Sequence, residues 1–207
     1  MTTVYLVRHG QSVANEKDLF IGHTDMALTE LGKAQAARTA EFFKDITVDA
    51  IYSSDLKRAY STAKATAKVK GLAVTVKKEL RDIFAGAWEA QAFSVLPKRY
   101  PEDYNLWLND IDASRCTCGE SVIEVKKRIT AAILDIIEQN TNKTVIVFTH
   151  AMPIRALRSY FDNAPVKDIP WPTNASVSCL DVTTQAFTLY SHDSFLAHLV
   201  TALPENV

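Results

Sequence analysis

Residues 4–15 read VYLVRHGQSVAN, an apolar run that passes directly into a cation, a histidine and a glycine. Four consecutive apolar, β-prone residues predict a short buried strand at positions 4–7. After that strand, the neutral imidazole of His9 can attack phosphorus near pH 7, and the Arg8 guanidinium can hold two phosphate oxygens at once. Gly10 lets a bulky phosphate approach the backbone. The triplet alone also fits a strand end that carries a surface histidine, so longer patterns must decide between the two interpretations.

Strands and helices alternate along the rest of the chain. Short apolar, β-prone runs predict further strands at 50–53, 74–76, 145–148, 176–182 and 187–191. Alanine-rich or amphipathic segments predict helices at 29–43, 55–70, 121–140 and 152–161. This alternation predicts an α/β fold, a three-layer α/β/α sandwich with a mostly parallel central sheet. In such a sheet the functional site lies at the carboxyl ends of the strands.

Several helix boundaries carry their own chemical signals. Thr29 and Asp55 are expected N-caps, because their side-chain oxygens can accept from the free amides of a first turn. Gly71 is expected to end the second helix. The S-x-x-E sequence at 121–124 is a capping box. These signals support the helix assignments independently of the apolar periodicity.

Residues 79–119 are less regular than the rest. Pro97, Pro101 and several aromatic residues predict short helices and loops here. We therefore expect residues 1–207 to form a single domain, with residues about 83–120 inserted as a small cap over one edge of the sheet.

Composition excludes several classes of protein. The 207 residues are 47% hydrophobic and 23% charged, with a net charge of −1, which gives no reason to expect nucleic acid or a membrane surface as a partner. No signal peptide or membrane span is expected, and three cysteines suit a reducing, cytoplasmic setting. Cys116 and Cys118 are expected to be free thiols in a loop, and Cys179 to lie in the core. The five histidines lack metal-ligand spacing, so neither a metal nor a cofactor is expected.

Three motifs together resemble one known family. They are residues 8–15 (RHGQSVAN), residues 22–25 (GHTD) and residues 28–32 (LTELG). This string closely resembles the histidine phosphatase superfamily, which includes the phosphoglycerate mutases, and the resemblance runs from residue 4 to about residue 158. It implies that His9 is the catalytic nucleophile and that Arg8 binds the phosphate.

The resemblance also implies two further phosphate-binding groups. Residues 54–63 resemble the segment that supplies a second phosphate-binding arginine, here Arg58, in the first turn of its helix. A bound anion there would be favoured by the helix dipole. Thr149 and His150 match the family's second histidine motif, although Ala151 stands where glycine is usual. We expect His150 to donate to the anion, with the Ala151 backbone amide behind it.

Phosphoester cleavage also needs an acid that can protonate the leaving alcohol and later activate water. Residues 80–89 resemble the family segment L-x-E-x-x-x-G-x-W-E, and Asp82 stands at the position of the usual glutamate. We assign the acid to Asp82, with Glu89 as the alternative carboxylate. Aspartate is one methylene shorter, which puts the reach to the leaving oxygen in question.

Other motif residues are expected to line the phosphate pocket. Asn15 matches a side-chain donor to the phosphate, and its alternative role is that of an ordinary turn asparagine. The further expected lining residues are Gln11, Ser12, Gly22, Thr24 and Ala151.

These roles together predict a phosphatase. A phosphomonoester of a small metabolite would phosphorylate His9, and water would then release phosphate. One alternative is a cofactor-dependent phosphoglycerate mutase, but the region after Asp82 is short, aromatic and poor in cations, which resembles the phosphatase branch and its less charged substrates. A second alternative is a non-catalytic module that binds a phosphorylated ligand. The sequence predicts neither the natural substrate nor the oligomeric state.

Overall fold

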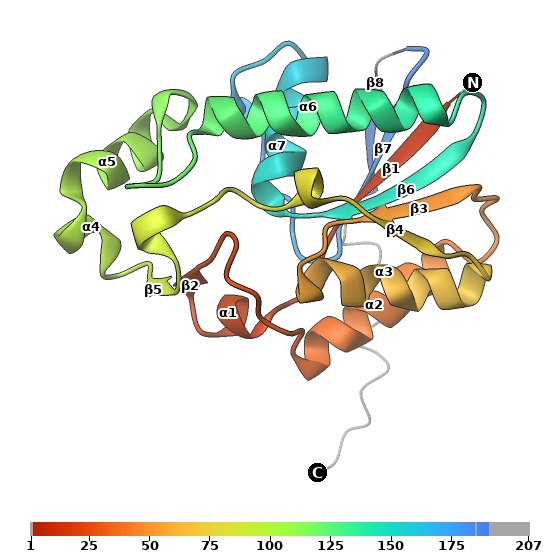
Figure 1. Cartoon of the computed structure of the whole chain (residues 1–207), viewed down its shortest axis with the longest axis horizontal. Helices are drawn as coiled ribbons and strands as arrows, with labels where there is room; N and C mark the ends of the chain where they lie inside the picture. The colour runs from red at the N-terminus through yellow and green to blue at the C-terminus, as the bar shows by residue number, and fades with distance from the viewer. Residues whose placement is uncertain (1, 185, 191–207) are drawn as a thin grey trace.

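The computed structural model describes residues 2–184 and 186–190, and its centre is a six-stranded sheet in the order β4-β3-β6-β1-β7-β8 (Figure 1). The strands are β1 (Thr3–Arg8), β3 (Ala50–Ser53), β4 (Val74–Val76), β6 (Thr144–Thr149), β7 (Val177–Asp181) and β8 (Ala186–Tyr190). The pairs β1–β6, β3–β6 and β3–β4 are parallel, whereas β7 runs antiparallel to β1 and β8. The expected mostly parallel sheet is confirmed. The last position of the expected strand 187–191 lies outside the described residues.

Helices cover both faces of this sheet, as a three-layer sandwich requires. Helices α2 (Glu30–Phe42) and α3 (Lys57–Lys70) lie on one face, and α6 (Val122–Gln139) and α7 (Ala151–Phe161) lie on the other (Figure 1). The alternation of side chains along β1 divides the core accordingly. Tyr5 and Val7 belong to the hydrophobic cluster under α2 and α3, whereas Val4 and Leu6 belong to the cluster under α6 and α7.

Most of the expected helix boundaries are confirmed. The Thr29 side chain accepts from the Gly32 amide, the capping box of α6 is formed on both sides, and Gly71 ends α3 at a left-handed φ of 65°. The prediction that Asp55 caps α3 is wrong, because the helix begins after Leu56 and no side chain of the N-cap bonds to it.

Asp55 has a stronger partner than a helix amide. Its carboxylate accepts from both Nε and an NH₂ group of Arg81, and a bidentate ion pair of this kind is favoured over a neutral donor. The first amide of α3, that of Lys57, instead donates to Asp25 Oδ1 at 2.7 Å. An acidic side chain therefore still stands at the positive end of the helix, but it comes from a distant loop.

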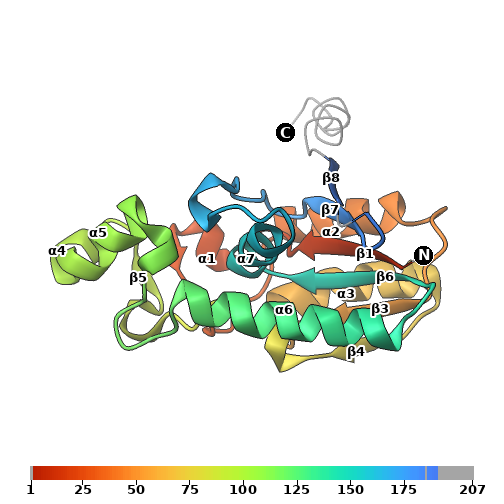
Figure 2. The ribbon, with the colours of Figure 1, turned by 90° about the horizontal axis from the view of Figure 1, so that it is seen from above.

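The cap extends beyond the carboxyl ends of the parallel strands (Figure 2). It contains α4 (Leu96–Arg99) and α5 (Pro101–Asn109), and the strand β5 (Gln91–Ala92) pairs with β2 (Leu19–Phe20) to join it to the N-terminal part, where α1 (Val13–Glu16) lies. Two-residue strands are too short for a periodic signal, so the sequence did not predict this ribbon. Trp88 is fully buried, with its ring 5.2 Å from Phe20 and 5.8 Å from Trp107 between centroids. Aromatic packing thus holds the cap to the main body.

The cysteines are unpaired, but only one of them is fully buried. Cys116 is buried and Cys118 is exposed, and Cys179 is half-buried on β7, where it packs against the hydrophobic cluster under α2 and α3. No helix in the described part of the chain is long and apolar enough to cross a membrane.

Candidate active site

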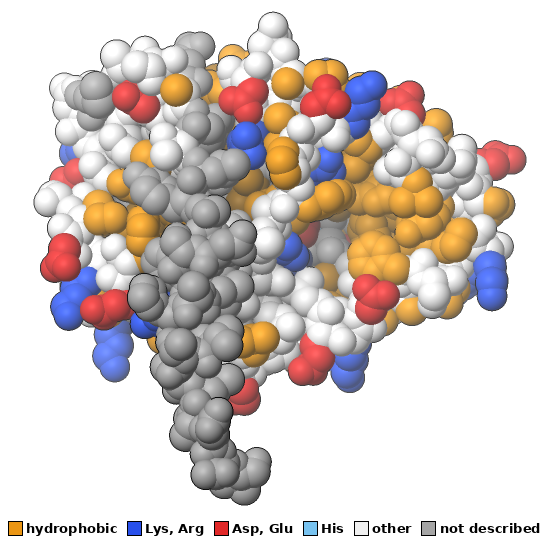
Figure 3. Space-filling model, turned by 180° about the vertical axis from the view of Figure 1, so that it is seen from behind, with side chains coloured by type: hydrophobic (Ala, Val, Ile, Leu, Met, Phe, Trp, Pro, Cys, Tyr) orange, Lys and Arg blue, Asp and Glu red, His pale blue; other side chains and the backbone are white. Residues whose placement is uncertain are grey.

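A cavity of about 380 Å³ opens between the sheet and the cap, where the two central strands end. Hydrophobic side chains surround this hollow on the face in Figure 3, with cationic groups inside it. His9 directly follows β1 and His150 directly follows β6. Because these strands are parallel neighbours with Arg8 opposite Thr149, the two imidazoles meet, with ring centroids 5.1 Å apart. Residues that lie 141 positions apart in the chain therefore reach one site through strand register alone.

His9 is held in one tautomer. Its Nδ1 lies 2.7 Å from the Gly10 carbonyl oxygen, which can only accept, so Nδ1 carries the proton and Nε2 keeps its lone pair. Burial and the nearby charges of Arg58 and Arg8 lower the pKa of His9 well below its usual value. The imidazole is therefore neutral at physiological pH, which is the state that a nucleophile requires.

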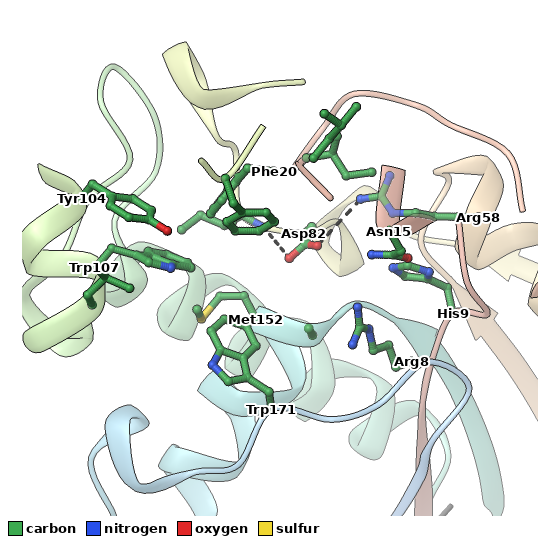
Figure 4. A pocket seen from close by; sticks show the side chains of 16 residues that line it. Arg8, His9, Asn15, Phe20, Arg58, Asp82, Tyr104, Trp107, Met152 and Trp171 are labelled. Carbon is green, nitrogen blue, oxygen red and sulfur yellow. Dashed lines mark hydrogen bonds and ion pairs between the residues drawn. The ribbon is translucent and has the colours of Figure 1, made fainter. Parts of the chain in front are cut away.

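Two guanidiniums flank this imidazole (Figure 4). Arg58 is fully buried, and its two terminal nitrogens donate to the carbonyl oxygens of Thr24 and Gly22. Arg8 donates from NH1 to the Pro172 carbonyl at 2.6 Å. The Nε atoms of both arginines are buried without a hydrogen-bond partner among the described residues. Burial lowers both pKa values, that of Arg8 to about 10. Because the ordinary pKa of arginine lies far above neutrality, both side chains remain charged at neutral pH and favour an anion between them.

His150 presents a further unpaired polar atom. Its Nε2 lies 3.0 Å from Ser54 Oγ, whereas its buried Nδ1 has no hydrogen-bond partner within the described ranges. Behind it, Ala151 and Met152 begin α7 and line the cavity. The free Nδ1 of His150 thus lies beside the positive end of α7. Both the imidazole nitrogen and the helix terminus favour the binding of an oxyanion.

Asp82 lies between these groups and the cap. Its Oδ2 is 3.8 Å from Arg58 NH2 and 3.8 Å from His150 Nδ1. Burial raises the pKa of Asp82 to about 6, and this effect outweighs the opposing influence of Arg58. A carboxyl group with this pKa can hold a proton and release it near neutral pH, as a general acid must.

The segment that carries Asp82 is fixed by its backbone. Thr149 Oγ1 donates to the Leu80 carbonyl at 2.7 Å, and Arg128 of α6 donates to the carbonyl oxygens of Arg81 and Asp82 at 2.9 and 3.1 Å. These contacts tie the acid to β6 and α6, so its position relative to His150 depends on the sheet and not on the cap.

Glu89, the alternative acid, has another function. Its carboxylate accepts from the backbone amides of Gly22, His23, Thr24 and Ala85, and it does not line the cavity. Burial alone would raise its pKa, but the hydrogen bonds from residues 22–24 outweigh that effect and lower it. Glu89 is thus an ionised anchor for the loop whose carbonyl oxygens hold Arg58.

The remaining expected pocket residues divide into two groups. Asn15 and Ala151 line the cavity. The Oδ1 atom of Asn15 accepts from Ser12 and Asn174, which leaves its NH₂ group as the donor for a ligand. The other four lie behind the cavity wall and support it: Gln11 bonds to Thr29, Ser12 caps α1, and Gly22 and Thr24 hold Arg58.

One side of the cavity was missed as a site during sequence analysis. Aromatic and aliphatic side chains from several separate segments form it, among them Phe20, Tyr104, Trp107, Met152 and Trp171 (Figure 4). The aromatic, cation-poor character of the cap was visible in the sequence and resembled the phosphatase branch, but it did not single out the side chains that face the cavity. Trp171 lies in an irregular stretch after α7, where no periodicity or motif marks it.

Comparisons with known proteins agree with this geometry. The family model described as the histidine phosphatase superfamily (branch 1) matches residues 4–194. The chain is 33% identical over 157 residues to phosphoserine phosphatase 1 of Hydrogenobacter thermophilus, which covers 76% of this chain and 74% of that one. It is also 33% identical over 157 residues to phosphoglycerate mutase-like protein 4 of Arabidopsis thaliana, covering 74% of this chain and 68% of the relative. Among solved structures, Bacillus stearothermophilus YhfR superposes with a TM-score of 0.86 at 25% identity, covering 92% of this chain and 96% of the other.

Proposed function

The chain belongs to branch 1 of the histidine phosphatase superfamily, and from that premise we propose that it hydrolyses a small phosphorylated metabolite through a phosphohistidine on His9. Membership and the phosphatase-named relative support a phosphoric monoester hydrolase. The observation that carries the proposed chemistry is the set of unpaired, buried polar atoms around His9, on Arg8, Arg58 and His150. Buried donors without partners are costly, and a bound phosphate would satisfy them together.

In the first step, His9 Nε2 attacks phosphorus. The P–N bond forms as the P–O bond to the alcohol breaks, and the departing oxygen takes the proton from Asp82. In the second step, the ionised Asp82 accepts a proton from water, the water oxygen attacks phosphorus, and the P–N bond breaks to release inorganic phosphate and neutral His9. Atoms and charges balance, and Asp82 returns to its protonated form.

The cations and His150 act on the non-bridging oxygens during both steps. Phosphoryl transfer is catalysed largely by positioning and by electrostatic stabilisation of these oxygens. Arg8 and Arg58 each bring a fixed positive charge, and the buried setting strengthens its effect. The two guanidiniums offset the charge of a phosphomonoester dianion, so the proposal includes no metal ion.

A mutase would place different demands on the cavity. It must hold a carboxylated phosphoglycerate while the phosphoryl group moves between two of its oxygens, which requires cations away from His9. The charged side chains that line the described cavity are Arg8, Arg58 and Asp82, and all three lie at the phosphate end. The relative named as a mutase-like protein keeps this activity as the second candidate. Asp82 lies 3.8 Å from both Arg58 NH2 and His150 Nδ1, where a carboxyl group serves proton transfer but not phosphate binding, and this position argues against a module that only binds phosphorylated ligands.

The test compares release of phosphate with isomerisation. Purified protein is incubated with p-nitrophenyl phosphate and, separately, with 3-phosphoglycerate and catalytic 2,3-bisphosphoglycerate. We expect phosphate release from the aryl ester and an acid-labile, base-stable label on the protein from ³²P-substrate. Isomerisation faster than phosphate release would instead establish a mutase. Absence of both turnover and label would establish the binding module.

A further inference from the structure

The part of the cavity away from His9 lacks charge. Beyond Asp82, its lining consists of apolar and aromatic side chains and one tyrosine. Phe20, Tyr104 and Trp107 contribute from the cap side, and Met152 and Trp171 from the side of α7 (Figure 4). The leaving group of a phosphate bound at His9 would extend past Asp82 into this part, because Asp82 must reach the ester oxygen. Its chemistry must therefore match an apolar wall.

Trp171 is placed there by a buried arginine. The Arg155 guanidinium lies 4.0 Å from the centroid of the Trp171 ring. Arg155 also donates from Nε to the Ile169 carbonyl and from NH2 to the Val166 carbonyl, each at 2.7 Å. One side chain thus fixes both the backbone before Trp171 and the face of its indole. A cation–π contact of this kind is strongest when the cation is desolvated, and Arg155 is only 3% exposed.

The indole of Trp171 contributes little to the core. It is 50% exposed, so burial does not explain why a buried arginine holds it in place. Its ring centroid lies 6.1 Å from that of Trp107 at a tilt of 39°. No further ring fits between planes at this separation, so the two indoles present one continuous apolar surface toward the cavity.

Building on the function proposed above, we propose that the substrate is a phosphomonoester whose alcohol is uncharged and carries a planar apolar group. That group packs against the surface formed by Trp171 and Trp107, and Arg155 acts as a positioning residue for Trp171. A leaving group with a carboxylate or an ammonium, such as that of phosphoserine, would lose water here without gaining a charged partner. The proposal therefore separates this chain's substrate from the one in the name of its phosphoserine phosphatase relative.

Three primary alkyl phosphates test the substrate class: 2-naphthylmethyl phosphate, ethyl phosphate and O-phosphoserine. None of them releases a phenolate, so differences in kcat/KM report mainly on the fit of the alcohol. We expect kcat/KM for the naphthylmethyl ester to exceed that for ethyl phosphate by at least about tenfold, since even one well-packed methylene can contribute that much. Phosphoserine is expected to be slower than the naphthylmethyl ester by about a hundredfold or more.

Variants then test the residues. We define the selectivity ratio as kcat/KM for the naphthylmethyl ester divided by kcat/KM for ethyl phosphate. This ratio should fall about tenfold in Trp171→Ala. It should recover in Trp171→Phe, because phenylalanine restores an aromatic face. Arg155→Met should lower the same ratio, mainly through a higher KM for the naphthylmethyl ester. Tyr160→Ala is the matched control, because Tyr160 is an exposed aromatic residue of α7 outside the cavity lining. It should keep the wild-type ratio.

The outcomes separate this inference from the proposed function. If the protein releases phosphate from phosphoserine as fast as from the naphthylmethyl ester, the proposed substrate class is wrong. The phosphatase proposal then still stands. A ratio that Trp171→Ala leaves unchanged overturns the assigned surface. Equal kcat losses for both esters in Arg155→Met, with the ratio retained, overturn its positioning role. Failure to release phosphate from every ester, p-nitrophenyl phosphate included, overturns the phosphatase proposal itself.

Discussion

The two ends of the cavity are built in opposite ways. The phosphate end consists of polar side chains at strand ends and helix starts. Backbone carbonyl oxygens accept hydrogen bonds from His9 and from the buried Arg58, and these bonds hold both side chains in place. The leaving-group end consists of apolar side chains from β2, α5, α7 and a loop, held by packing and by one cation–π contact. Directional hydrogen bonds fix the first end by distance and angle, whereas apolar packing fixes the second mainly by volume and shape.

This difference separates chemistry from selectivity. Changes at the phosphate end should act on every substrate, because every substrate brings the same phosphoryl group. Changes at the leaving-group end should act on some substrates and spare others. Asp82 lies at the boundary and should behave as a mixture of the two. The expected effects decrease from His9→Ala through Asp82→Asn to Glu89→Gln.

Loss of the nucleophile should abolish the common chemistry. We expect His9→Ala to lower kcat/KM for all esters by at least about 10⁴-fold, since the covalent route is removed. Rates with p-nitrophenyl phosphate and ethyl phosphate, together with ³²P labelling, measure this. His150→Ala is the matched control: it should react slowly yet still acquire the acid-labile label. Activity of His9→Ala within a few-fold of wild type would contradict the assignment of the nucleophile.

Loss of the acid should discriminate between leaving groups. Asp82→Asn should slow ethyl phosphate by about 10²–10⁴-fold, and p-nitrophenyl phosphate far less, because nitrophenolate leaves without a proton. Asp82→Glu should keep substantial activity, since a carboxyl group remains. The comparison of kcat for the two esters in each variant tests the role. If ethyl phosphate is hydrolysed normally by Asp82→Asn and poorly by Glu89→Gln, the acid has been assigned to the wrong carboxyl group.

The pH profile should show the same boundary residue. Burial raises the pKa of Asp82 to about 6, so the protonated form that donates to the alcohol is present below this pH and is lost above it. For ethyl phosphate, log kcat/KM should therefore fall above pH 6 by about one unit for each pH unit. The second ionisation of the substrate phosphate also has a pKa near 6, but it affects the pH profiles of the wild type and of Asp82→Asn equally. An identical profile in that variant would mean that Asp82 does not supply the proton.

The smallest effect on rate should come from Glu89. Glutamine can offer one oxygen where the carboxylate of Glu89 now accepts from four backbone amides. We expect Glu89→Gln to lower the free energy of unfolding by about 1–3 kcal/mol and to reduce kcat only a few-fold, because the loop that holds Arg58 loosens. Thermal unfolding and kcat measure the two effects, with exposed Glu138→Gln as the control. A large loss of kcat without loss of stability would indicate a chemical role.

The phosphate end could be predicted from the sequence almost completely. Arg8 and His9 follow a short apolar strand, which a local pattern reveals, and parallel strand order brings His9 and His150 together. The resemblance to the family added Arg58, His150, Asp82 and Asn15. The structure places Arg58, Asp82 and Asn15 at the cavity and His150 beside His9. The wrong N-cap at Asp55 has a tertiary cause, because its partner Arg81 lies 26 positions away, and no local rule anticipates that contact.

The leaving-group end could not be predicted in the same way. Phe20, Trp107 and Trp171 meet because the ribbon β2–β5 folds the cap back and because Arg155 holds a loop. Two-residue strands carry no periodicity, and a ring on an irregular segment has the same sequence appearance whether it packs in a core or faces a ligand. Gly22 and Thr24 show the converse: their motif is readable, but their role as carbonyl supports for Arg58 is visible only in three dimensions.

The position of β1 in the sheet has a consequence for how the protein is made. β1, which leads into His9, is synthesised long before both of its neighbours, because β6 begins only at Thr144 and β7 at Val177. Two further backbone partners are synthesised after β6. The Pro172 carbonyl oxygen accepts a hydrogen bond from Arg8, and the Ala175 amide donates to the His9 carbonyl oxygen. Until β6 has been synthesised, His9 has neither of these neighbouring strands beside it and lacks its contact with His150. A nascent chain that has not yet reached β6 therefore lacks both the second histidine and the strand register that brings it to His9.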